Sequence, residues 1–278
     1  MSLAKRSGVA DGLASGALAL TAIAAAAGLA VTGLYRDNAA MIRQAHASDL
    51  ATLLVAVPVL AIGLWRARDG SAAGRHVALG ALGFIAYTYA IFAFSVVIGP
   101  ATVLHIAIVG LATWSLILLT GSIESSPPDP ELAARLPRRT TAAFLLVVVV
   151  LFAFTWLGLI AGAITSGRLP PAVADLNLPT NPVYTLDLAF ALPVLTIGGI
   201  RLIRGDPRGP GTALALLMFS VLMGISVLAI FLVEARAGGA VDAPIALVFA
   251  AVVLIGTGLL AVGLAPAGRS LLVEPVGP

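Results

Sequence analysis

The stretch AAFLLVVVVLFAFTWLGLIAGAIT, residues 142–165, decides the fold of this chain. It contains no charged side chain, and a helix needs about 20 mostly apolar residues to cross a bilayer. Apolar runs of similar character flank it, separated by loops rich in Gly, Pro, Asp and Arg. Their approximate ranges are 13–34, 50–65, 77–99, 101–120, 186–203, 211–233 and 243–265. Each run is expected to be helical, because an open strand in lipid leaves its backbone groups unpaired.

The composition agrees with this interpretation. The 278 residues are 60% hydrophobic and only 10% charged, with a mean hydropathy of +1.06. Soluble domains average roughly 45–50% apolar and about 25% charged residues. We therefore expect an all-α polytopic transmembrane bundle of eight spans. The absence of Cys excludes thiolate catalysis and Fe–S clusters, and scattered basic residues argue against nucleic-acid binding.

Basic residues predict the orientation. Cytoplasmic loops of membrane proteins carry an excess of Lys and Arg. With the N-terminus inside, one side holds Lys5, Arg6, Arg66, Arg68, Arg75, Arg135, Arg138, Arg139, Arg201, Arg204, Arg208 and Arg269, and the other holds Arg36, Arg43, Arg168 and Arg236. We expect a multi-pass protein of the bacterial plasma membrane with both termini cytoplasmic, the bacterial origin being suggested by the excess of Arg, Ala and Gly.

A short motif occurs twice. Residues 58–66 and 193–201 share the pattern P-V-L-x-I-G-x-x-R at an offset of 135 residues. The motif falls at the same place in the second and sixth spans. We therefore expect two parallel four-helix halves, 1–122 and 142–278, joined by a cytoplasmic linker, 123–141. Chance matching of Ala- and Leu-rich helices is the alternative.

The loops and the two mid-span prolines carry local signals. Asp129-Pro130-Glu131 predicts a short linker helix that ends before Pro137. The segment 35–48 has helical spacing and is expected to lie flat on the outer surface. The proline-rich segment 166–185 is expected to pack on the bundle as a plug or lid. Pro58 and Pro193 should kink their spans, either as hinges or to shape the bundle.

Ionisable and polar groups within or beside spans are the candidate functional residues, because such groups are costly in lipid. Most lie near the predicted outer ends of the helices, while two tyrosines of the third span lie closer to the middle. The set is Asp49, His105, Asp187, His46, Asn181, Tyr184, Tyr87, Tyr89 and Glu234. One hypothesis is that the outer groups form a single polar pocket for a cation, a divalent metal or a polar lipid head.

Simpler structural roles remain open for the same residues. Asp49 and Asp187 stand at the expected starts of helices, where an Asp caps free N–H groups. Glu234 could pair with the nearby Arg236. His105 could be a satisfied structural histidine.

No cofactor or metal is assigned by the sequence. Haem would need His105 with His46 or His76 as axial ligands, and His76 lies on the opposite side. HExxH, G-x-S-x-G and P-loop signatures are absent from the sequence. Gly158 and Gly162 form a GxxxG pattern, which suits packing within the chain or a homodimer contact.

Two stretches, 34–50 and 178–193, resemble those of polytopic membrane proteins of GC-rich bacteria that have no assigned activity. The resemblance implies a membrane location and no activity. Two functions remain: a binder or carrier of a small molecule, lipid or cation, with the lipid bilayer as its surroundings, and a membrane enzyme using His105 with Asp49 or Asp187 on an outer-leaflet substrate. An accessory subunit without a ligand is a third possibility.

Overall fold

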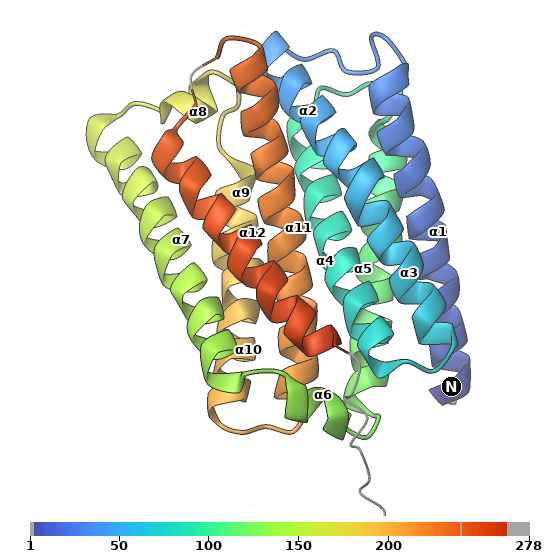
Figure 1. Cartoon of the computed structure of the whole chain (residues 1–278). Helices are drawn as coiled ribbons and strands as arrows, with labels where there is room; N and C mark the ends of the chain where they lie inside the picture. The colour runs from blue at the N-terminus through green and yellow to red at the C-terminus, as the bar shows by residue number, and fades with distance from the viewer. Residues whose placement is uncertain (1–2, 240, 266–278) are drawn as a thin grey trace, which may run out of the picture.

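The computed structural model describes residues 3–239 and 241–265, and in them it is a bundle of α-helices (Figure 1). Eight of the described helices are long and apolar enough to cross a membrane, so the expected fold class is confirmed. The spans are Gly8–Ala30, Ala39–Arg68, Ala72–Ser95, Thr102–Glu124, Arg138–Ser166, Pro182–Ile203, Gly209–Arg236 and Ala243–Leu264. Arg269 lies outside the described residues.

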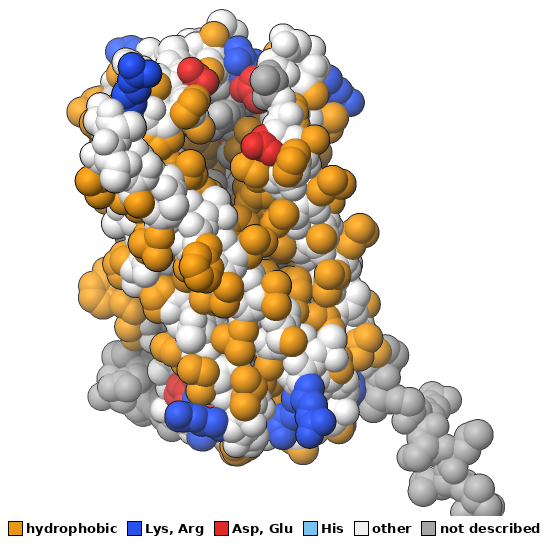
Figure 2. Space-filling model, turned by 90° about the vertical axis from the view of Figure 1, so that its left-hand side faces the viewer, with side chains coloured by type: hydrophobic (Ala, Val, Ile, Leu, Met, Phe, Trp, Pro, Cys, Tyr) orange, Lys and Arg blue, Asp and Glu red, His pale blue; other side chains and the backbone are white. Residues whose placement is uncertain are grey.

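The spans run alternately up and down, and their two ends differ in charge. Helix α1 (Leu3–Ala30) begins and α12 (Ala243–Leu264) ends at the lower side of Figure 1. We call this side the basic end, because it carries Arg66, Arg68, Arg75, Arg135, Arg138, Arg139, Arg201, Arg204 and Arg208. The other side is called the opposite end. Between the ends, hydrophobic side chains cover most of the surface seen in Figure 2, as expected for a lipid-facing belt.

Two helices form the centre of the bundle. Helix α4 (Ala72–Ser95) packs against α5 (Thr102–Glu124) on one side and against α11 (Gly209–Arg236) on the other. Helix α11 in turn packs against α12. Around this centre, α1 lies on α5, and α7 (Arg138–Ser166) lies on the helix that ends the sixth span. Much of the core is therefore contributed by α4 and α11.

The second and sixth spans share a backbone irregularity. The second span consists of α2 (Ala39–Ala51), a π-helical turn η1 (Thr52–Ala56) and α3 (Val57–Arg68). The sixth consists of α9 (Pro182–Leu186), η2 (Asp187–Ala191) and α10 (Leu192–Ile203). Each π turn ends just before a proline, which lacks the N–H needed to continue the α-helical ladder. Both turns and both following helices stand 135 residues apart in sequence.

The loops that follow these spans are also alike. Gly70 and Gly205 each end a helix with a positive φ, 85° and 74°, a conformation that glycine adopts without a steric cost. The next residue's N–H donates to Arg66 O in the first loop and to Arg201 O in the second, at 3.0 Å in both. A Cβ on Gly74 would meet the backbone at Arg66, and one on Gly209 would meet it at Arg201.

Helices α4 and α11 touch through small residues. A Cβ on Gly80 would lie 2.3 Å from Ala215 O, and one on Gly211 would lie 2.2 Å from His76 Nε2. In both pairs the partners are 135 residues apart, like the two motif copies. Each contact therefore joins two positions that the repeated motif aligns.

Several local expectations can now be compared with the structure. The linker helix is confirmed as α6 (Pro130–Arg135), capped by Asp129. The expectation that 35–48 lies flat is wrong, because Asn38 caps a helix that continues directly into the second span. In the outer proline-rich segment, α8 (Pro171–Ala174) buries Val173 to 1% exposure, and Asn38 Nδ2 donates to Asp175 O at 3.0 Å.

The glycine patterns differ in their surroundings. Gly158 and Gly162 have open space where a Cβ would stand. The GxxxG pattern therefore makes no close helix contact within the described residues. Gly80 and Gly256 do face neighbouring helices closely.

Candidate functional site

The predicted polar groups lie in two clusters on different sides of α4. Tyr87 and Tyr89 are two residues apart, which turns their side chains by about 200° around a helix. Tyr87 faces the sixth span and Tyr89 faces α1 and α5. The single pocket expected from the sequence is therefore replaced by an Asp187 cluster and an Asp49 cluster, named after their acidic residues.

The Asp187 cluster is built from three spans. Tyr87 Oη of α4 donates to Asp187 Oδ1 at 2.7 Å, and Trp156 Nε1 of α7 donates to Asp187 Oδ2 at 2.6 Å. Tyr184 stacks near Trp156, with ring centroids 5.2 Å apart. Both carboxylate oxygens are thus hydrogen-bonded by neutral donors, while the side chain remains half-buried. The cluster offers a carboxylate and two aromatic rings to a polar ligand.

The Asp49 cluster is more deeply buried. Tyr35 Oη donates to Asp49 Oδ2 at 2.6 Å, and Asp49 is 1% exposed. Burial, with the nearby Asp49 charge second, raises the pKa of the Tyr35 phenol well above its ordinary value, so this hydroxyl stays protonated and donates. Asp49 Oδ1 is buried without a hydrogen-bond partner in the described residues.

His105 lies beside this cluster inside an aromatic shell. It is 2% exposed. The centroid of its ring lies 5.2 Å from that of Phe92, 5.6 Å from that of Tyr89 and 6.5 Å from that of Tyr35. The ring of His46 lies 5.8 Å from Tyr35, but its side chain is exposed. In the described residues, the imidazole of His105 is not a hydrogen-bond partner of either Asp49 or Asp187.

The helix-cap interpretation of the two aspartates is wrong. Asn38 caps the second span by accepting from Met41 N, and Asn181 caps the sixth by accepting from Val183 N. Asp49 and Asp187 lie inside their continuous spans. Their carboxylates therefore need partners from elsewhere in the chain, which Tyr35 of the α1–α2 connection and Tyr87 of α4 provide.

Glu234 also has a different partner from the one considered. Its Oε2 lies 2.9 Å from Arg43 NH2 and 3.0 Å from Arg43 Nε. The pairing with Arg236 is therefore wrong. The ion pair joins α2 of the second span to α11 near the opposite end.

No group of three or more His, Cys, Asp or Glu side chains able to hold a metal ion occurs in the described residues. The arrangement of the two clusters instead suits hydrogen bonding. A carboxylate held by tyrosine and tryptophan can accept from a hydroxyl or amine of a ligand.

The side of the molecule next to the Asp187 cluster is open. All buried residues of α7 lie between Thr141 and Val148, in its half nearer the basic end. Those of α12 lie between Val252 and Gly263, again in that half. Figure 2, which views the side on which α7 lies, shows a recess in the half nearer the opposite end. By contrast, α5 buries His105 and Ile108 in its own half nearer the opposite end.

Aromatic rings connect α7 and α12 at the level where their buried residues end. The ring centroids of Phe152 on α7 and Phe249 on α12 lie 5.2 Å apart, and those of Phe152 and Trp156 lie 5.8 Å apart. The two splayed helices thus meet at Phe152 and Phe249. Trp156, which also bonds Asp187, stands one helical turn further toward the opposite end.

Two important residues were not anticipated as site residues. Trp156 lies in a run without charged residues, yet a buried indole N–H usually finds an acceptor, which was the available signal. Tyr35 lies in a short connection, and nothing in its local sequence indicated a partner 14 residues away.

The fold and these clusters define an eight-span integral membrane protein. No family model, no curated protein and no solved structure matches the chain.

Proposed function

We propose that this protein binds, and as a carrier translocates, an amphipathic molecule that enters from the lipid between α7 and α12. The observation that carries the proposal is the position of Asp187. This half-buried carboxylate accepts from Trp156 of α7, a helix that buries no residue in its half nearer the opposite end. A carboxylate accessible at this depth is costly in lipid, and a ligand's polar group would offset that cost.

The recess suits the apolar part of such a ligand. The parts of α7 and α12 nearest the opposite end hold none of the buried residues of these helices, and the rings of Phe152 and Phe249 mark the level at which the two helices meet. Ligand pockets are typically apolar with a few polar groups that fix orientation. Here an alkyl chain would lie between the two helices.

The polar group of the ligand would lie at the Asp187 cluster. A carboxylate accepts hydrogen bonds from hydroxyl and amine groups and repels anionic ones. Tyr184 and Trp156 add aromatic faces that attract a cation. We therefore expect a neutral hydroxyl or a cationic amine headgroup.

The charge asymmetry supports the orientation. The basic end would face the cytoplasm of a bacterial plasma membrane, following the positive-inside tendency. The Asp187 cluster would then be reached from the outer leaflet.

Two parallel halves related by a two-fold axis along the membrane normal are part of the same proposal. Equivalent π turns, equivalent loops and the α4–α11 contacts support it. Only at a two-fold axis does a residue contact its own equivalent, as Gly80 and Ala215 do. The two halves then differ in one pair of helices. Helices α7 and α12 separate near the opposite end, whereas their equivalents in the first half, α1 and α5, stay packed on each other.

Tryptophan fluorescence tests the binding proposal. The chain has three Trp, so W65F/W114F leaves Trp156 as the sole reporter. Full-length protein in detergent is titrated with brominated dodecyl amphiphiles carrying amine, hydroxyl or sulfate heads. We expect saturable quenching by the amine and hydroxyl probes, weaker quenching by the sulfate probe, and at least tenfold weaker binding in D187L.

A control variant separates specific binding from partitioning. Phe190 is 63% exposed on the same span, and F190L should bind as the parent does. Quenching that is linear in probe concentration, or that is unchanged in D187L, would refute the binding site and favour an accessory subunit.

A further inference from the structure

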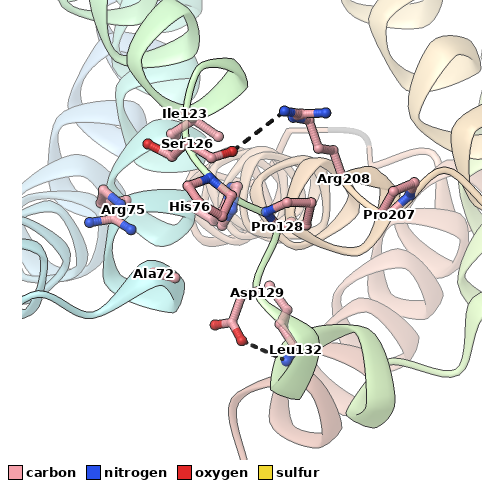
Figure 3. Close-up of a pocket in the computed structure, with 12 residues that line it drawn as sticks. Ala72, Arg75, His76, Ile123, Ser126, Pro128, Asp129, Leu132, Pro207 and Arg208 are labelled. Carbon is pink, nitrogen blue, oxygen red and sulfur yellow. Dashed lines mark hydrogen bonds between the residues drawn. The ribbon is translucent and has the colours of Figure 1, made fainter. Parts of the chain in front are cut away.

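A second, separate cavity lies at the basic end, where the two halves meet (Figure 3). Its walls come from the start of α4, the segment between α5 and α6, and the loop before α11. The polar residues lining it are Arg75, His76, Ser126, Asp129 and Arg208. Its free volume is small, about 30 Å³, so it fits a single compact polar group.

Two arginines bring positive charge to this cavity. Arg208 makes only long contacts, 3.5 Å to Ser126 O and 3.6 Å to Glu124 Oε2. Its Nε is a buried donor without a hydrogen-bond partner in the described residues. Arg75 forms no ion pair in that same part of the chain. A guanidinium carries five N–H donors, so both side chains retain free donors.

His76 is a second group that lacks a partner. It is 9% exposed, and its Nδ1 is buried without a hydrogen bond in the described residues. The other edge of the ring lies against Gly211, where a Cβ would stand 2.2 Å from Nε2. Glycine at 211 therefore allows the imidazole to lie against the start of α11.

The start of α11 adds a positive helix end. This helix is 28 residues long and begins without a side-chain cap at Arg208. The N–H of Gly209 already donates to Asp206 O at 2.9 Å and Pro210 has no N–H, so Gly211 supplies the remaining N–H of the first turn, and the helix dipole favours an anion. Phosphate groups commonly bind at such helix ends.

The neighbouring acidic groups make hydrogen bonds of their own. Asp129 Oδ1 accepts from Glu131 N at 2.9 Å and Leu132 N at 3.3 Å. Arg201 holds Glu124 through 2.6 Å and 3.0 Å bonds, and holds Asp206 at 2.7 Å. The unused hydrogen-bonding capacity of the cavity is therefore mainly donor capacity, from Arg75, Arg208 and His76.

We infer that this cavity binds a phosphate group, held by Arg75 and Arg208 with His76 and the start of α11 beneath it. Guanidinium groups match phosphate oxygens in two-point contacts. The phosphate could belong to free inorganic phosphate or to the headgroup of an anionic phospholipid. The site is independent of the recess at Asp187, which lies near the opposite end.

Two arms of one experiment distinguish the sources. Thermal unfolding of the full chain in detergent is followed against inorganic phosphate, and separately against phosphatidylglycerol with phosphatidylcholine as the comparison lipid. Ligand binding to the native state raises the unfolding temperature. Saturable stabilisation by inorganic phosphate assigns a soluble anion, and stabilisation by phosphatidylglycerol alone assigns a lipid headgroup.

Variants link the effect to the cavity. R75Q and G211A should each weaken the apparent affinity at least tenfold, the second by displacing His76 without removing charge. R139Q is the matched control, since Arg139 is exposed at the same end and should leave affinity unchanged. An equal loss in R139Q, or no saturable effect from either ligand, would overturn the inference.

Discussion

The phenol of Tyr87 on α4 donates a 2.7 Å hydrogen bond to the carboxylate of Asp187, 100 residues further along the chain. This bond joins the first half of the bundle to the sixth span. Trp156 donates to the other carboxylate oxygen at 2.6 Å. The Asp187 carboxylate is therefore held by two side chains from separate helices.

Removing the Tyr87 hydroxyl should destabilise the protein more than removing that of Tyr89. Y87F leaves one oxygen of Asp187 without its donor, at a cost of about 1–3 kcal/mol. Tyr89 makes only a 3.3 Å bond to the carbonyl of Thr21, so Y89F should cost less. Thermal unfolding in detergent measures the stability of both variants. Equal losses of stability would show that the Tyr87 hydrogen bond contributes no more than the Tyr89 hydrogen bond.

Gly28 is expected to be essential to the Asp49 cluster. A Cβ there would lie 1.9 Å from Asp49 Oδ2 and 2.8 Å from Tyr35 Oη. G28A should therefore separate this pair and destabilise the fold by about 1–3 kcal/mol, as overpacking does. G12A on the same helix meets open space and should change stability by less than about 1 kcal/mol. The comparison requires only the two melting temperatures, and a G28A protein as stable as G12A contradicts the described packing.

Close packing of α4 on α11 should depend on Gly80 and not on Gly83. A Cβ at 80 would meet Ala215 O at 2.3 Å, whereas one at 83 would make an ordinary 3.5 Å contact with Phe219. We expect G80A to lower the free energy of unfolding by about 1–3 kcal/mol, seen as a lower unfolding temperature. G83A should be close to neutral. If G83A were the more harmful variant, the proposed axis contact would be misplaced.

Acid should weaken the loop before α11 through Asp206. A backbone hydrogen bond from Arg208, followed by the Arg201 side chain, lowers the pKa of this carboxyl below its ordinary value of 3.8. A group with a lowered folded-state pKa stabilises the fold above its unfolded pKa, and this contribution is lost as the pH falls through the folded value. D206N should therefore be less stable than the parent at neutral pH, with the difference shrinking below about pH 4. A pH-independent difference between the two unfolding curves would contradict this assignment.

Much of the architecture could be predicted from the sequence. Each apolar run of sufficient length is a span, because lipid leaves a helix no alternative to internal hydrogen bonding. The linker helix was predictable too, since Asp129, Pro130 and Pro137 are local start and stop signals. Local signals failed at residues 35–48, where helical spacing suggested a helix flat on the surface but Asn38 caps the start of a span.

The candidate site could be predicted only in its residue types. Polar groups near the helix ends were recognisable because they are costly in lipid. Their partners were not, because Arg43 with Glu234 and Trp156 with Asp187 come from different spans, and Tyr35 reaches Asp49 from the connection before its span. The π turns at Thr52 and Asp187 were likewise hidden, although their prolines were visible.

The sequence by itself determined the number of spans and the charge difference between the ends, since these depend on local hydrophobicity and on charges along the chain. Only the tertiary structure decided that α4 divides the polar residues into two clusters and that α7 and α12 separate near Asp187. Those features depend on how helix faces are rotated and how closely backbones approach, and small residues such as Gly28 and Gly80 control that approach through contacts remote in sequence.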